Sequence, residues 1–232
     1  MAKSPNTNPH ISINKLAEFM SAKPARQRQI LRDQKYPTDF KGMYYKEATE
    51  TISHAIASNL EDLDSIDKAI DILEQMSPEK IGTQRRIAAN IDALETFRDM
   101  LDKVDITGAT PIRGGISQPK LSLMGVEISV RPEIILKLQG KTKQLIGAIK
   151  LHFPRTFPIS DDSSGYLSAV LQEWAKIAMP DDGAVSGADC YVIDIGASRV
   201  CTGVKATANR MRDIEAVCEN IAALWPTIKP SP

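Results

Sequence analysis

The chain has 232 residues, of which 42% are hydrophobic and 25% are charged, and its 29 basic residues are balanced by 29 acidic ones. This length fits one or two domains of an ordinary soluble protein, and zero net charge argues against a chain that is basic throughout. The three cysteines show no CxxC spacing, so neither a disulfide framework nor a structural zinc site is expected.

The first residues contain no apolar core of the secretory kind, and no apolar run approaches the roughly 18 residues of a membrane span. We therefore expect a cytoplasmic protein without membrane contact. Basic residues gather near the start, because residues 1–46 hold nine lysines and arginines against three acids. Solvated helix faces are the simpler explanation, and a local surface for a phosphate backbone is the alternative. The candidate nucleic-acid-binding residues are Lys23, Arg26, Arg28, Arg32, Lys35 and, further along the chain, Arg131.

The N-terminal half has the periodicity of helices. A polar, proline-bearing tail is expected at residues 1–10. After it, apolar residues recur every three or four positions, which is the spacing of one helix face. The predicted helices cover residues 11–20, 23–34, 44–60, 63–76 and 83–104. We expect residues 11–107 to form one helical region.

Glycines and prolines at residues 108–119 predict a linker loop between this region and the rest of the chain. Beyond it the hydrophobic period changes to two, which predicts strands. The expected elements are strands at 120–130 and 144–153, a helix at 163–179, two short strands at 190–196 and 199–204, and a closing helix at 208–225. An α/β core at 120–226 is followed by a tail at 227–232, and the predicted fold class is α+β or mixed α/β.

The strand at 144–153 is apolar on one face and carries Lys150 on the other, where His152 is expected to be a rim residue. If the preceding turn is centred near Gly140, Glu133 lies roughly opposite Ala148. Side chains paired across two strands share one surface, so Glu133 would face the lysine.

Arg131 would then lie opposite Lys150, and Glu127 would share their surface. A carboxylate can hold a hard cation such as Mg²⁺, and a lysine can stabilise charge on an attacked phosphate. The alternative is structural, because Glu133 and Lys150 would also suit an exposed ion pair across the strands.

Two short motifs carry a resemblance to a known family. Pro132-Glu133 is followed, one hairpin later, by Ala148-Ile149-Lys150. The pattern resembles the PD-(D/E)XK, or restriction-endonuclease-like, superfamily, and most of all its RecB-type nuclease branch. In that family an acid on one strand precedes a (D/E)XK motif on the next, a helix precedes the strands, and a helix and another strand follow. The predicted order of elements over residues 42–205 matches this arrangement.

The resemblance implies a Mg²⁺-dependent nuclease of the kind found in bacterial defence or mobile elements. Glu133 would hold the metal and Lys150 would steady the developing charge, which makes these two the candidate catalytic residues. Glu127 or Glu47 would be further metal ligands. Glu50 is the alternative to Glu47 as the acid on the preceding helix.

The chain departs from the family pattern at Ala148, where the family places its second acid. Either an acid from elsewhere, Glu127 or Glu47, replaces it, or the site is inactive. Gln172 would stand for a polar residue on the following helix. The sequence thus leaves three functions open: phosphodiester hydrolysis, an inert adaptor that binds a protein partner through the helices of residues 42–104, and nucleic-acid binding without cleavage.

Overall fold

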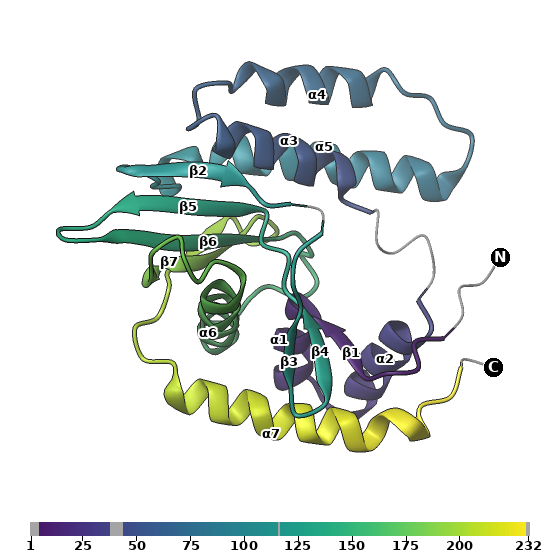
Figure 1. Cartoon of the computed structure of the whole chain (residues 1–232). Coiled ribbons are helices and arrows are strands. Elements are labelled where there is room, and N and C mark those ends of the chain that lie inside the picture. Colours follow the sequence, from purple (N-terminus) through teal and green to yellow (C-terminus); the bar gives the residue numbers. More distant parts are fainter. Residues whose placement is uncertain (1–4, 38–43, 116, 231–232) are drawn as a thin grey trace.

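The computed structural model describes residues 5–37, 44–115 and 117–230 (Figure 1). These ranges contain seven α-helices and two mixed sheets, of three and five strands, so the predicted α+β class is confirmed. In the same ranges, no helix is both long and apolar enough to cross a membrane.

The larger sheet has the strand order β2-β5-β6-β7-β8. Its strands are β2 (Ala109–Arg113), β5 (Ile134–Gln139), β6 (Gln144–His152), β7 (Ala184–Asp194) and β8 (Arg199–Cys201). β6 and β7 run parallel, whereas the other neighbours are antiparallel. The α-helix α6 (Asp161–Ala178) joins β6 to β7, because parallel neighbours need a crossover connection.

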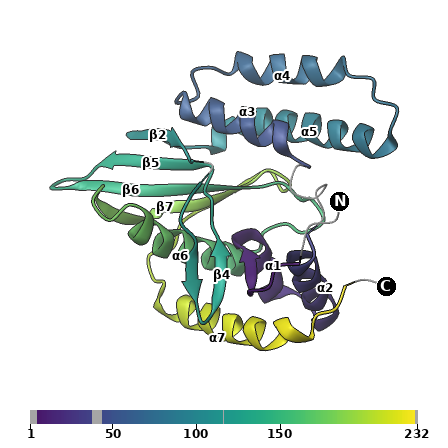
Figure 2. The same ribbon diagram turned by 45° about the vertical axis from the view of Figure 1, so that its right-hand side comes forward.

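Helices cover both faces of this sheet (Figures 1 and 2). On one face lie α3 (Lys46–Ala57), α4 (Asp64–Glu74) and α5 (Ile81–Asp99), which pack with Ile149 and Leu151 of β6. On the other face lie α1 (Ile13–Ser21), α2 (Pro24–Lys35), α6 and α7 (Ala208–Leu224), which pack with Ile146 and Ala148. The alternation of β6 is therefore as predicted, although both of its faces are buried.

Residues 11–107 do contain the helices α1 to α5, but these helices do not pack together as one region. α1 and α2 contribute to the core beneath the sheet, whereas α3, α4 and α5 contribute to the core above it. Helical periodicity shows which side of a helix is apolar, but not which face of a sheet that side will meet.

The prediction of one strand at 120–130 is wrong. The structure has a hairpin of β3 (Leu121–Leu123) and β4 (Val126–Ser129), which joins β1 (His10–Ser12) in the three-stranded sheet β1-β4-β3. Met124 and Gly125 both have positive φ, as the two central residues of a type I′ hairpin turn do. The hydrophobic alternation on both sides of the turn conceals it.

Two other predicted boundaries need correction. The expected linker at 108–119 contains β2, which is an edge strand of the larger sheet. Proline has no backbone N–H, and an edge strand tolerates Pro111 because one side of the strand has no neighbouring strand to bond. The expected tail at 1–10 is tied down from residue 6, since the backbone N–H of Asn6 donates to the carbonyl of Lys35. At the other end, Lys35 Nζ donates to the carbonyl of Ile228, which fixes part of the expected tail at 227–232.

Candidate functional site

The predicted pair of Glu133 and Lys150 does share one face of the sheet. Ile134 lies opposite Ile149 and Ile135 opposite Ala148, and Glu133, directly before this ladder, has its side chain beside that of Lys150. The predicted register is thus wrong by two residues, because the turn is closed by a bond from the Gly140 N–H to the Lys143 carbonyl. An even shift keeps every side chain on its face, and the prediction of a shared surface is therefore correct.

The two side chains form a closed ion pair. Lys150 Nζ lies 2.5 Å from Glu133 Oε1 and donates a second hydrogen bond to the carbonyl of Arg131 at 2.8 Å. The other carboxylate oxygen, Oε2, accepts the backbone N–H of Leu151 at 2.7 Å. The side chains are only 11% and 15% exposed. Both oxygens of Glu133 are therefore occupied by donors from β6.

This arrangement follows from the way the chain passes from the small sheet to the large one. Arg131 has a positive φ of 40°, and the chain turns there before β5 begins. The Glu133 N–H donates to the carbonyl of Ile149, which lies opposite Ile134, so this bond is offset by one residue from the regular ladder. On the N-terminal side of Glu133, no backbone carbonyl of β5 is available among the described residues to accept the N–H of Leu151. The Glu133 carboxylate accepts that N–H instead. The Glu133 side chain thus satisfies the hydrogen-bonding groups of β6 where the chain before β5 leaves the sheet.

The other predicted metal ligands lie elsewhere. Glu127 is on β4 in the small sheet and pairs with Lys120 at 2.6 Å. Glu47 is on α3, above the sheet face opposite to that of Lys150, and pairs with Arg86. Ala148 is fully buried. The prediction that these acids surround Lys150 is wrong, and within the described ranges no three His, Cys, Asp or Glu side chains are grouped to hold a metal. The residues present do not fit a Mg²⁺ centre.

The two other helix residues named by the resemblance are also apart from the pair. Glu50 lies on the surface of α3 and is 3.8 Å from Lys46. Gln172 on α6 is buried, and its Nε2 donates to the carbonyl of Val204 at 2.7 Å. The contacts of both residues are those of structural residues, and neither residue lies near Lys150.

Half of the predicted basic surface is used to hold the fold together. Arg26 Nε donates to Glu18 at 2.7 Å, and Lys35 Nζ donates to the carbonyl of Trp225 at 2.7 Å. Arg32 Nε donates to the carbonyl of Lys229. The remaining predicted residues are exposed, and they are Lys23, Arg28 and Arg131.

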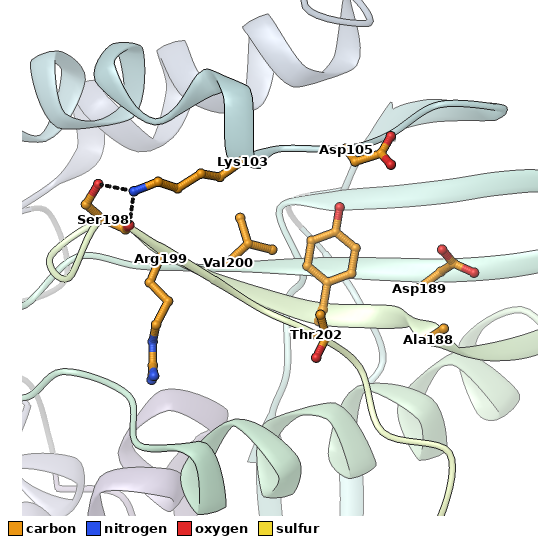
Figure 3. A pocket seen from close by; sticks show the side chains of 9 residues that line it. Lys103, Asp105, Ala188, Asp189, Ser198, Arg199, Val200 and Thr202 are labelled. Carbon is orange, nitrogen blue, oxygen red and sulfur yellow. Dashed lines mark hydrogen bonds between the residues drawn. The ribbon is translucent and has the colours of Figure 1, made fainter.

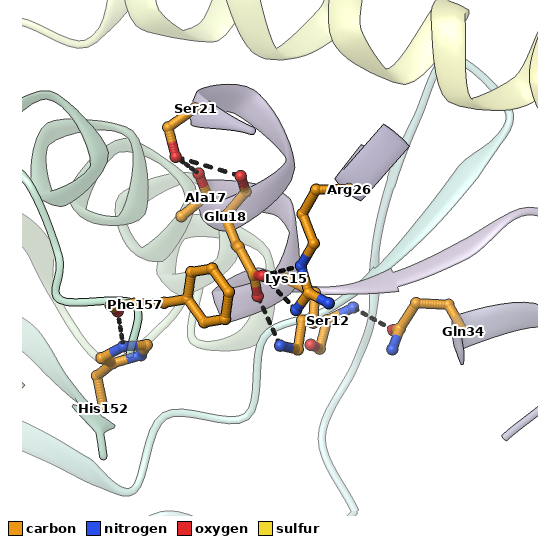
Figure 4. Close-up of polar contacts among 9 residues, drawn as sticks. All are labelled: Ser12, Lys15, Ala17, Glu18, Ser21, Arg26, Gln34, His152 and Phe157. Carbon is orange, nitrogen blue, oxygen red and sulfur yellow. Dashed lines mark hydrogen bonds and ion pairs between the residues drawn. The ribbon is translucent and has the colours of Figure 1, made fainter. Parts of the chain in front are cut away.

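A small cavity lies at the end of β6, on the same face as Lys150 (Figure 4). Its volume is about 160 Å³, and its walls come from α1, β6, the loop after β6 and the start of α6. His152 lines it and is only 4% exposed, so the prediction of a rim residue is wrong. Its Nε2 lies 2.7 Å from the carbonyl of Phe157, which fixes the ring against the loop.

Asp194 holds the loop that forms this cavity. It lies opposite His152 on β7 and is fully buried. Its carboxylate accepts the backbone N–H groups of Ile159 at 2.7 Å and of Ala197 at 3.2 Å. Asp194 and the α1 residues Asn14 and Glu18 belong to no recognisable sequence motif. The only sequence feature that could have indicated this site is a charged residue, Asp194, at the end of a buried strand.

Burial lowers the pKa of His152 below its ordinary value of about 6.5, although the Phe157 carbonyl and the Asp194 carboxylate oppose the shift. The imidazole of His152 therefore binds a proton more readily in the unfolded chain than in the folded chain. The stability that His152 contributes is present above its unfolded pKa and is lost as the pH falls. We expect the free energy of unfolding to fall less steeply between pH 7 and pH 5 in His152→Gln than in the wild type. Urea unfolding at several pH values measures this, and identical slopes would contradict it.

A larger cavity, of about 540 Å³, lies beside β8 (Figure 3). Lys103 lies at one end, where its Nζ donates to the carbonyl of Ser198 at 3.0 Å, and Asp105 and Asp189 lie at the other. Tyr191 also lines it, and its buried hydroxyl has no partner among the described residues. None of these residues was predicted to line a site, because they are distant in sequence and meet only where the edge of the sheet brings them together.

The chain matches no protein-family model, and no curated protein was found to be similar to it in sequence.

Proposed function

We propose that this chain is a nucleic-acid-binding protein with a PD-(D/E)XK-like core whose own Glu133–Lys150 centre does not cleave phosphodiesters. The order of elements in the larger sheet and its helices supports the likeness: helix α5, strands β2 and β5, the lysine strand β6, helix α6 and strand β7, with the β3–β4 hairpin of the small sheet inserted between β2 and β5. The shared face of Glu133 and Lys150 supports it as well.

The observation that carries the absence of cleavage is the closed state of this pair. A site for Mg²⁺ needs several oxygen ligands in near-octahedral geometry, and the ion gives up its water reluctantly. Glu133 supplies one carboxylate whose two oxygens already accept from Lys150 and Leu151. Position 148, where the family pattern has its second acid, is a buried alanine.

A cleavage assay tests this proposal. Supercoiled plasmid and single-stranded DNA are incubated with the protein and Mg²⁺ or Mn²⁺, and we expect no nicking or cutting above that of a blank preparation. The comparison variants are Lys150→Ala, Glu133→Ala and a matched control, Lys137→Ala, whose lysine pairs with Asp182 at the surface. Metal-dependent cleavage that is lost in the first two variants and kept in the control would show an active nuclease instead.

Binding to nucleic acid is measured on the same preparations by gel shift. The exposed residues Lys23 and Arg28 would contact phosphates, and such contacts weaken as salt rises because counterions are released on binding. Substitution of both by alanine should therefore weaken the shift. A shift that does not depend on salt would contradict phosphate contact.

A second candidate function, protein adaptor, is favoured by three exposed apolar side chains on α4, in the loop after it and at the start of α5. Ile72 is 58% exposed, Met76 47% and Ile81 66%. α4 is the outermost helix, with α3 and α5 between it and the sheet (Figure 1). Exposed apolar patches often mark protein contacts. Co-purification of a partner that Ile72→Asp releases would support this candidate.

A further inference from the structure

The cavity at the end of β6 has a defined hydrogen-bonding character, which comes first from His152. A carbonyl oxygen can only accept, so Nε2 must carry the proton that His152 shares with the Phe157 carbonyl at 2.7 Å. In the neutral ring, Nδ1 is then an acceptor. Nδ1 is buried and has no partner among the described residues. The depressed pKa of His152 agrees with a neutral ring at pH 7.

Asn14, on α1, presents a second acceptor among the residues that line the cavity. Its Nδ2 donates to the carbonyl of Leu151 at 3.3 Å, which sets the orientation of the amide. Its Oδ1 is buried and, within the part of the chain that the structure describes, has no donor. A buried acceptor without a donor costs about 1–3 kcal/mol, so two of them in one cavity indicate a ligand that donates.

The charges around the cavity favour a neutral ligand. Glu18 lines it, but its carboxylate is held by Lys15 at 2.6 Å and by Arg26 at 2.7 Å (Figure 4). The negative charge is thus already balanced by two cations. A ligand of this cavity need not bring a positive charge of its own.

The remaining walls combine apolar side chains with the hydroxyl groups of Ser21, Thr156 and Ser163, and the space is small. Ala17, Pro158 and Ile159 line the cavity, and the ring of Phe157 lies at its side with the Arg26 guanidinium 4.7 Å from the ring centroid. A volume of about 160 Å³ is close to the roughly 150 Å³ of a cavity that accepts benzene. A cavity of this volume accepts one six-membered ring.

We propose that this cavity binds the aminopyrimidine ring of cytosine, whose amino group donates to His152 Nδ1 and Asn14 Oδ1. Cytosine offers an N4 amino donor, whereas thymine carries an O4 acceptor at the same position. Uracil resembles thymine there, and it would place an acceptor against two acceptors. The source of the ring as an unpaired base of a nucleic acid rests on the proposed function.

The test compares cytidine with uridine, which differ in the group at C4 and in the hydrogen that uracil carries on N3. Isothermal titration calorimetry with the full chain should show cytidine binding at least about tenfold more tightly than uridine, because a site built around hydrogen bonds rejects an analogue that cannot make them. Bound cytidine should also shift the ¹⁵N resonance of His152 Nδ1. Equal affinities, or no binding of cytidine, would overturn the proposal and leave ordered water as the partner of both acceptors.

His152→Gln is the matched variant, since its amide nitrogen replaces the Nε2 donor to Phe157 and leaves no acceptor at the Nδ1 position. It should bind cytidine more weakly than the wild type does and retain only the part of the preference that Asn14 Oδ1 supplies; an undiminished preference for cytidine would contradict the assignment. If this variant does not fold, the wild-type comparison of the two nucleosides still decides.

Gel shifts with oligo(dC) and oligo(dT) separate this proposal from the proposed function. Cytidine binding without any nucleic-acid binding would uphold the cavity and overturn the function. Nucleic-acid binding without preference for cytosine would uphold the proposed function and overturn the assignment of the cavity.

Discussion

Glu133→Ala is expected to lower the free energy of unfolding by about 3 kcal/mol, because it leaves the ammonium of Lys150 largely buried without its carboxylate. Removing one partner of a buried ion pair costs about 3–5 kcal/mol, and both side chains here keep only a small exposed fraction. The backbone N–H of Leu151 loses its acceptor as well. Urea unfolding followed by circular dichroism measures the change.

The surface pair of Lys137 and Asp182 provides the control, since its lysine lies on the strand next to β6 but its partners are 33% and 45% exposed. Exposed pairs are worth about 0–1 kcal/mol. Asp182→Ala should therefore cost less than about 1 kcal/mol. A loss of similar size in Glu133→Ala would show that the Glu133–Lys150 pair is no stronger than a surface contact.

Asp194→Ala is expected to cost about 3 kcal/mol and to release the loop that forms one wall of the small cavity. The substitution leaves two backbone N–H groups, of Ile159 and Ala197, without the carboxylate that accepts them. Hydrogen bonds to charged groups contribute about 1.5–3 kcal/mol each. Hydrogen exchange at the Ile159 amide should become faster, together with the fall in stability.

Asp194→Asn is the conservative comparison, because its amide keeps one acceptor oxygen and replaces the other by a donor. We expect it to lose about half as much stability as Asp194→Ala. Unchanged exchange at the Ile159 amide in both variants would contradict the role assigned to Asp194.

The hydrophobic pattern predicted the fold class and one essential feature of the site. Because side chains alternate along a strand, Glu133 and Lys150 could be placed on one face even though the predicted pairing of their strands was shifted by two residues. Alternation is insensitive to an even error of register. The burial of β6 on both faces follows from the same sequence, which is apolar along almost its whole length.

Other features depend on contacts that are distant in sequence. Asn14 reaches the carbonyl of Leu151, 137 residues away, and this contact creates the small cavity. The turn at Met124-Gly125 lacks the asparagine or aspartate that usually precedes glycine in such turns. Missing it placed Glu127 on the wrong sheet, and the predicted metal site depended on that placement.

A double-mutant cycle on Glu133 and Lys150 tests most directly whether the acid is engaged by the lysine. The free energy of unfolding is measured for the wild type, Glu133→Ala, Lys150→Ala and the double variant. A closed pair predicts that the double variant loses at least about 1.5 kcal/mol less than the sum of the two single losses, as residues in direct contact do. Additive losses would mean that the Glu133 carboxylate is free to serve another partner, and would contradict the inactive centre proposed for this chain.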